Sequence, residues 1–147
     1  MIRPAKAEDI QALLPVLRDL HKKTPYAHLE EDEIAAKKTM AFALGSKQMF
    51  FWVSERAGRV VGLLLGGVDH IALPVKGKQA SDILFYVQEG NEGVLLAKQF
   101  MKWGWAQPGV KMVGLSVSSG DTRSDDFIDR LGLQRVGGIY LQFDQES

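Results

Sequence analysis

The segment from residue 83 to residue 96 constrains the fold more than any other part of the chain. An apolar run at 83–87 has the composition of a buried strand, and an apolar pattern with helical spacing starts at Gly93. The short stretch between them contains Gly90 and Asn91, which tolerate positive φ. A strand that enters a helix through so short a loop brings free backbone N–H groups together. The segment is therefore either an anion cradle suited to a pyrophosphate or an ordinary tight turn.

Alternating strand and helix patterns over the rest of the chain predict a mixed α+β fold, with helices packed on a central sheet. Helices are expected over residues 10–20, 31–44, 93–105 and 121–131. Strands are expected over residues 2–4, 49–55, 60–68, 82–87, 110–117 and 135–143, with a loop or irregular hairpin over 69–81. Pro15 predicts a kink or a late start of the first helix. Glycines inside 60–68 predict a bulge or a close backbone approach.

The composition excludes several classes of function. The chain has 147 residues, no cysteine, and 18 basic against 18 acidic side chains. That length suits one domain over residues 1–147, and the absence of thiols excludes a disulfide framework, a Cys-ligated zinc and a cysteine nucleophile. The balanced charge argues against nucleic acid or an anionic membrane as partner, and no apolar run approaches the ~20 residues of a membrane helix. The three histidines lack the spacing of metal ligands. We therefore expect a cytoplasmic enzyme or binding domain without a metal.

Three segments, together with the order of the elements, resemble the GNAT superfamily of N-acetyltransferases over nearly the whole chain. Residues 2–5 before an apolar helix look like the family's opening, and residues 56–62 look like the hairpin between its second and third strands. Residues 88–93 resemble its acetyl-CoA motif, which reads Gln or Arg, two residues, Gly, one residue, then Gly or Ala. Gln88 and Gly93 match that motif, and Asn91 replaces the middle glycine. The resemblance implies the acyl-CoA N-acyltransferase fold, a mixed and mostly antiparallel sheet flanked by helices.

The same resemblance implies acetyl-CoA as co-substrate. The residues expected to bind it are Tyr86, Val87, Gln88, Asn91, Gly93, Val94 and Asp121. Asp121 is equally interpretable as the N-cap of the helix that follows it. Glu89 and Glu92 stand where the family usually places basic residues beside the pyrophosphate.

The last third of the chain resembles a family segment that contains an Asn, a small residue, and a Tyr four positions before Gly-Phe. Asp121 and Ser124 hold the first two positions, and residues 132–133 read Gly-Leu. Ile128 stands at the Tyr position, where the family often has a general acid, and isoleucine cannot donate a proton. Three functions therefore stay open: an N-acetyltransferase, a non-catalytic GNAT-fold binding or structural protein, and a CoA-binding regulator without turnover.

For the transferase, the resemblance implies direct attack of a primary amine on the acetyl thioester. The protein would polarise the thioester carbonyl through a backbone N–H near Tyr86 or Val87 and take a proton from the ammonium. Tyr86 and Ser118 are the predicted catalytic residues, and Tyr26, His28 and Tyr140 are predicted to line the acceptor site. Each also has a plainer interpretation as a core, surface or turn residue. The acceptor is expected to be a small-molecule or peptide amine, and the tryptophans after residue 102 leave a homodimer open.

Overall fold

A computed structural model describes residues 1–116, 128–137 and 140–144, and these contain one five-stranded sheet in the order β1-β2-β3-β4-β5. Its parallel pair is β4–β5, and the other three neighbouring pairs are antiparallel. The strands are β1 (Ile2–Pro4), β2 (Met49–Arg56), β3 (Arg59–His70), β4 (Lys78–Val87) and β5 (Val110–Gly114). The helices are α1 (Asp9–Lys22), α2 (Glu33–Gly45) and α3 (Gly93–Ala106). The mixed, mostly antiparallel sheet flanked by helices confirms the expected fold class.

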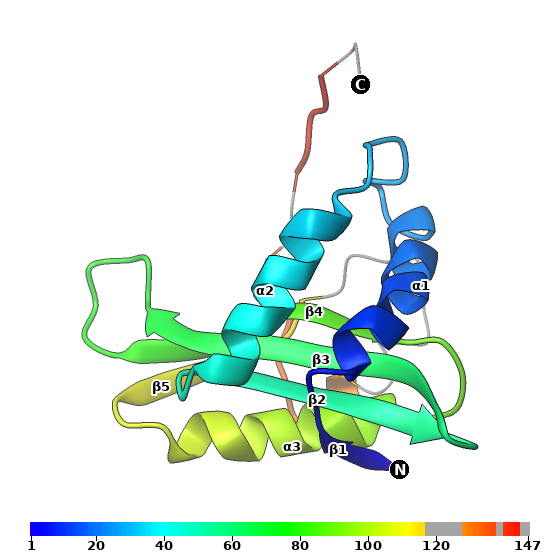
Figure 1. Cartoon of the computed structure of the whole chain (residues 1–147). Coiled ribbons are helices and arrows are strands. Elements are labelled where there is room, and N and C mark those ends of the chain that lie inside the picture. The colour runs from blue at the N-terminus through cyan, green and yellow to red at the C-terminus, as the bar shows by residue number, and fades with distance from the viewer. Residues whose placement is uncertain (117–127, 138–139, 145–147) are drawn as a thin grey trace.

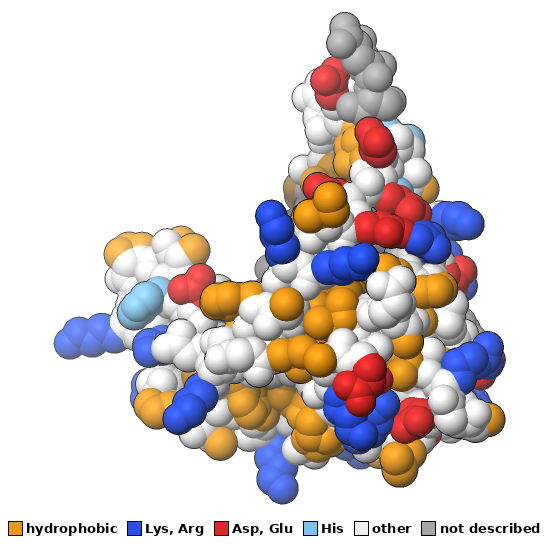
Figure 2. All heavy atoms as spheres, viewed as in Figure 1, with side chains coloured by type: hydrophobic (Ala, Val, Ile, Leu, Met, Phe, Trp, Pro, Cys, Tyr) orange, Lys and Arg blue, Asp and Glu red, His pale blue; other side chains and the backbone are white. Residues whose placement is uncertain are grey.

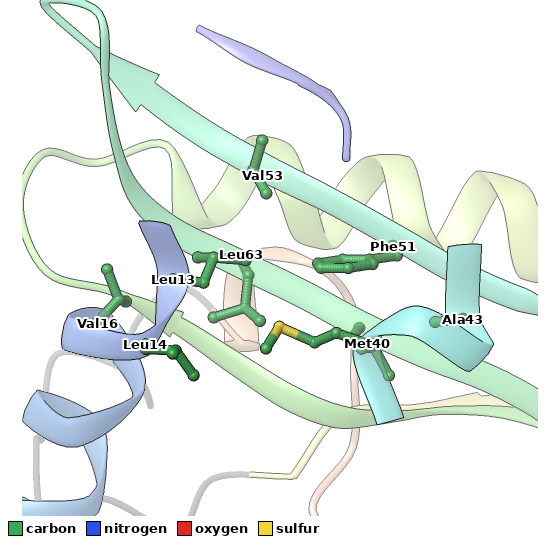
Figure 3. Close-up of a cluster of buried hydrophobic side chains, with 9 residues drawn as sticks. Leu13, Leu14, Val16, Met40, Ala43, Phe51, Val53 and Leu63 are labelled. Atoms are coloured by element: carbon green, nitrogen blue, oxygen red, sulfur yellow. The ribbon is translucent and has the colours of Figure 1, made fainter. Parts of the chain in front are cut away.

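The helices cover both faces of the sheet, α1 and α2 on one face and α3 on the other (Figure 1). Under α1 and α2 lies a core of aliphatic side chains with Met40 and Phe51, and Figure 3 shows them converging between the helices and the sheet. The second core lies under α3 and is centred on Phe100, which is fully buried. Burying such a side chain stabilises the fold by about 1.5–3 kcal/mol. Close approach at Gly66 confirms the expectation from the strand glycines, because a Cβ there would lie 2.6 Å from Cε1 of Phe100.

Element boundaries differ from the sequence prediction at two places. Of the two alternatives for 69–81, the irregular hairpin is confirmed and the loop is wrong, because β3 continues to His70 and β4 begins at Lys78, where the two residues pair. Polar side chains are compatible with strands at the exposed end of a hairpin, which hides this extension from a hydrophobicity pattern. The late start considered for the first helix is also wrong, because α1 runs through Pro15 from Asp9. Pro15 and the residue four before it, Gln11, are both exposed, so water can satisfy the carbonyl that loses its partner.

The carboxyl-terminal part of the chain departs most from expectation. Within the described residues 135–137 and 140–143, the predicted final strand is wrong, since none of them is in a strand. Val136 and Tyr140 are 93% and 96% exposed, so no neighbouring strand covers them. Figure 1 shows the end of the chain standing away from the sheet. Its Phe143 instead packs edge-on against His28, with ring centroids 4.4 Å apart. The predicted helix over 121–131 lies mostly outside the described residues, of which 128–130 are helical.

No helix in the described part of the chain is long and apolar enough to cross a membrane.

Candidate functional site

Strand β4 is the element around which the site is built, because its two halves have different neighbours. It pairs with β3 over its whole length, but its pairing with β5 ends at Ser81, opposite Gly114. The half of β4 from Asp82 to Val87 therefore extends beyond the described pairing with β5. The carboxyl ends of neighbouring parallel strands are where open α/β sheets bind their ligands.

A β-bulge separates the two halves of β4. Gly66 of β3 pairs with Asp82 and Leu65 pairs with Leu84, so Ile83 is an extra residue without a partner in β3. The extra residue reverses which face of the sheet the even-numbered side chains occupy. Before the bulge, Ala80 packs in the core under α3, and after it, Leu84 packs in the core under α1 and α2.

The bulge also determines where Tyr86 and Val87 point. The Tyr86 side chain lies on the face of α1 and α2, whereas Val87 packs on the face of α3. The N–H of Gln88 donates to the carbonyl of Val61 in β3 at 2.8 Å. Alternate residues of an antiparallel strand address the same neighbour, so the N–H of Tyr86 also faces β3. Of the two N–H groups named from the sequence, that of Val87 points to the β5 side.

The loop after β4 has the backbone geometry that its glycines predict. Gly90 has a φ of +85°, which side chains rarely adopt, and a Cβ there would lie 2.4 Å from Nη1 of Arg56. Gly93 opens α3 and differs from Gly90, since a Cβ there would make ordinary contacts of 3.7 Å with Phe85 and Val87. Packing therefore does not require glycine at position 93, and the side chain of the N-cap residue Glu92 does not cap the first N–H groups of α3. Asn91 is exposed.

The two acids of the loop are paired with groups at or before the starts of β1 and β3 and in β2. Glu92 accepts hydrogen bonds from the amino group of Met1 and from the buried hydroxyl of Ser54, and both lower the pKa of its carboxyl. Glu89 is 2.9 Å from Nη2 of Arg59, in an exposed ion pair. The negative charges of Glu89 and Glu92, which would repel a pyrophosphate, are therefore paired with donor groups of this chain.

Arg56 and Arg59 are site residues that sequence analysis missed. Both belong to the turn between β2 and β3, and the antiparallel register sets the start of β3 beside the end of β4. Pairing between strands far apart in the sequence cannot be predicted from a local pattern. The sequence therefore showed only two arginines in a hairpin turn and did not indicate that they lie near the loop after β4.

Asp82 is a third residue that sequence analysis missed. Its Oδ1 accepts a hydrogen bond from the backbone N–H of Ser116 at 2.7 Å, which joins β4 to the residues that follow β5. Burial raises the pKa of Asp82 to about 6, because a low dielectric disfavours the charged carboxylate. A carboxyl with this pKa can accept and release a proton near neutral pH. The signal in the sequence was an acid at the start of an apolar strand.

On the other face, the Tyr86 hydroxyl joins β4 to the end of α1. It donates to Oδ2 of Asp19 and accepts a hydrogen bond from Nζ of Lys23 at 2.7 Å. Burial and the bond to Asp19 raise the pKa of Tyr86, so the phenol keeps its proton at neutral pH. Hydrogen bonding to Tyr86 lowers the pKa of Asp19 and raises that of Lys23. The side chain of Gln88 also reaches Asp19, at 3.4 Å.

The remaining predicted site residues are not all brought together by the structure. Tyr26 and His28 lie between α1 and α2, where both contact the ring of Phe143, and a bond between Nε2 of His21 and the Tyr26 carbonyl holds this connection. Tyr140 is almost fully exposed and is not brought to β4 by any described contact. Ser118 and Asp121 lie outside the described residues. Among the residues that the structure describes, no group of three or more His, Asp or Glu could hold a metal ion.

No protein-family model and no curated protein sequence matches the chain. Solved structures do match over almost the whole chain. Glucosamine-6-phosphate N-acetyltransferase from Arabidopsis thaliana is 13% identical, with 97% of each chain covered and a TM-score of 0.72. The aminoglycoside 6'-N-acetyltransferase from Acinetobacter haemolyticus is 14% identical, with 99% of this chain and 98% of that chain covered and a TM-score of 0.66. A related aminoglycoside N-acetyltransferase, solved in complex with CoA, is 13% identical, covering 99% and 94%, with a TM-score of 0.71.

These likenesses establish the fold. The chain shares the fold of these N-acetyltransferases, which confirms the fold that the resemblance in sequence implied.

Proposed function

We propose that this protein is an acetyl-CoA-dependent N-acetyltransferase that moves an acetyl group to a primary amine by direct attack. The observation that carries the proposal is strand β4, which is bulged at Ile83 and extends beyond its pairing with β5. The strand then enters α3 through a loop whose Glu92 side chain does not cap the first N–H groups of the helix. The fold is shared with enzymes whose names state N-acetyl transfer to aminoglycosides and to glucosamine 6-phosphate.

The residues of the loop fit the phosphates of acetyl-CoA, which would supply the acetyl group as an activated thioester. The N–H groups of Gly93 and Val94 at the start of α3 are suited to a pyrophosphate, with Gln88 and Asn91 beside them. The N–H of Val87 is directed to the open side of β4, where it can donate to a carbonyl oxygen. The acids of the loop leave this fit intact, because Glu89 and Glu92 are paired with groups of this chain.

Asp82 is the residue that we propose takes the proton from the acceptor ammonium. Its position at the end of the β4–β5 pairing and its pKa of about 6 suit that role, since it is ionised at neutral pH and protonated only in acid. Tyr86 is a proposed site residue through its hydroxyl bonds rather than as a base, because its raised pKa keeps it protonated. Ser118 stays a prediction, as do a small-molecule or peptide acceptor and a homodimer.

The identity of residue 128 favours an alternative function, a non-catalytic binding or structural role. Ile128 stands where the family that the sequence resembles often has a tyrosine that donates a proton, and isoleucine has no proton to donate. The two functions differ in whether free CoA thiol is released when an amine is supplied.

The proposal is tested by calorimetric titration with acetyl-CoA, followed by assay of thiol release with a panel of primary amines. We expect Gly93→Val to weaken acetyl-CoA binding by about tenfold or more with little change in Tm, because the branched side chain would crowd the phosphates away from the first N–H groups of α3 and weaken a charge-assisted hydrogen bond. The matched control is Gly45→Val, which places the same side chain in open space at the end of α2. Binding that is unchanged by Gly93→Val, or absent in the wild type, would contradict the proposal. Binding without thiol release for any amine would favour the non-catalytic alternative.

A further inference from the structure

The end of α1 and the exposed half of β4 form a set of groups suited to an ammonium ion. The carboxylate of Asp19 and the hydroxyl of Tyr86 both face the same ammonium, that of Lys23. Nζ of Lys23 lies 3.3 Å from Oδ2 of Asp19 and 2.7 Å from the phenol oxygen. A carboxylate and a neutral acceptor oxygen are two groups that bind ammonium ions in proteins.

Lys23 is a replaceable occupant of this set. It is the first residue after α1, its side chain is 56% exposed, and that of Asp19 is 35% exposed. An exposed pair at this spacing is worth less than about 1 kcal/mol, so water or another cation can displace the lysine at little cost. Tyr86, by contrast, is anchored in the core under α1 and α2.

We propose that Asp19, Tyr86 and Gln88 form a subsite for an ammonium group of the acceptor, and that Lys23 fills this subsite when no acceptor is bound. The inference rests on the proposed N-acetyltransferase function and specifies its substrate class. Asp19 and Tyr86 bind the ammonium directly, and Gln88 positions the Asp19 carboxylate from 3.4 Å.

The ammonium bound there is not the amine that reacts. A nucleophilic amine must lose its proton, whereas the bonds to Tyr86 and Asp19 raise the pKa of the Lys23 ammonium that now occupies the subsite. The reacting amine lies instead beside Asp82, which precedes the bulge and leaves β4 on the other face of the sheet. Because the two ammonium groups occupy different sites, the acceptor is a flexible diamine or polyamine rather than a monoamine.

The surface around the subsite favours such a cation. Residues 30–33, between α1 and α2, are all acidic, and Figure 2 shows acidic side chains gathered where the chain enters α2. Arg18 compensates part of this charge through Glu31 and Glu33. A field of this sign raises the local concentration of polycations.

The experiment compares diaminooctane with aminooctanol, which has the same chain but a hydroxyl in place of the far ammonium. Binding to the full chain is measured by calorimetry without acetyl-CoA. We expect Asp19→Asn to weaken diaminooctane binding by about tenfold, and Lys23→Met to strengthen it several-fold by removing the internal competitor. Aminooctanol has a single ammonium, which can fill the subsite or the reacting position but not both at once, so its binding should change less than that of diaminooctane in each variant. Glu30→Gln is the matched control, because it removes the same charge nearby without touching the subsite.

The same pair of amines is then assayed for acetyl transfer. Asp19→Asn should lower kcat/KM for diaminooctane by about tenfold and should leave kcat/KM for aminooctanol unchanged, because reversed binding of aminooctanol at the subsite changes kcat and KM by the same factor. The subsite is overturned if the two amines bind equally, if Asp19→Asn weakens both to the same extent, or if Glu30→Gln has the same effect as Asp19→Asn. Absence of transfer with Asp19-dependent diamine binding would instead contradict the proposed function and support the subsite.

Discussion

Helix α1 carries an aspartate–cation cluster at each end, and the two clusters differ mainly in their exposure to water. At its start, Asp9 accepts a pair of hydrogen bonds from the guanidinium of Arg3, which also pairs with Glu55 at 3.0 Å. At its end, Asp19 meets Lys23 and Tyr86. The side chains of Arg3 and Asp9 are 19% and 5% exposed, whereas those of Lys23 and Asp19 are 56% and 35% exposed.

Because of this difference in exposure, we expect the first cluster to stabilise the fold and the second to bind a ligand. A buried, fully bonded pair cannot lose a partner without leaving an uncompensated charge, so the first cluster fixes β1, α1 and β2 to one another. An exposed pair contributes little to stability and can exchange its partner, so the second cluster can bind a ligand. Similar side chains thus hold the fold together at one end of α1 and remain available at the other.

The largest effect on folding is expected from Asp9→Asn. The variant leaves the Arg3 guanidinium partly buried without its main partner, and we expect the free energy of unfolding to fall by about 3 kcal/mol. Urea denaturation measures this value. Adding both Arg3→Met and Glu55→Gln to Asp9→Asn should recover part of the loss, because no member of the ion-pair cluster is then left charged without a partner. A loss below about 1 kcal/mol would mean that the first cluster is as dispensable as the second.

The contribution of the Arg3–Asp9 cluster to the stability of the wild-type protein should be lost at low pH. The hydrogen bonds from Arg3 hold the pKa of Asp9 below its usual value. A carboxyl with a lowered folded-state pKa stabilises the protein above its unfolded value of about 3.9, and this contribution is lost as the pH falls through the lower, folded value. Wild type and Asp9→Asn should therefore converge in stability in acid, as measured by urea denaturation at several pH values. Curves that stay parallel down to acid would contradict the assignment.

The smallest effect on folding is expected from Asp19→Asn. It removes the same charge from the same helix, yet the free energy of unfolding should change by less than about 1 kcal/mol, and the change should shrink in high salt. Thermal melts at low and high ionic strength measure it. A loss comparable with that of Asp9→Asn would show that the cluster at the end of α1 is structural.

Local patterns in the sequence predicted most of the elements, because strands and helices under a core follow their own periodicities. The apolar spacing of α3 and the glycine after α2 placed those helices to within a few residues. The final strand was wrongly predicted because a strand pattern requires a neighbour, and the exposed Val136 has none in the described residues. Pairing across the sheet is not encoded in a local pattern.

The candidate site was less predictable for the same reason. Period-two alternation could not assign a face to Tyr86, because the bulge at Ile83 reverses the alternation in mid-strand. Arg56 comes to the loop after β4 only through the register of β3, and Asp19 comes to Tyr86 only through the packing of α1 on the sheet. Asp82 was visible in the sequence, but its raised pKa depends on burial that the fold creates.

The central claim, proton transfer at Asp82 during acetylation, is tested most directly by the pH dependence of kcat/KM for wild type and Asp82→Asn with one amine. Because burial disfavours the charged form of Asp82, the Asn variant should keep or raise its Tm at neutral pH. The account predicts that wild-type kcat/KM, relative to the variant, rises with pH through about 6, and that the variant is slower by about 100-fold or more. A variant within a few-fold of wild type, with the same pH profile, would contradict it.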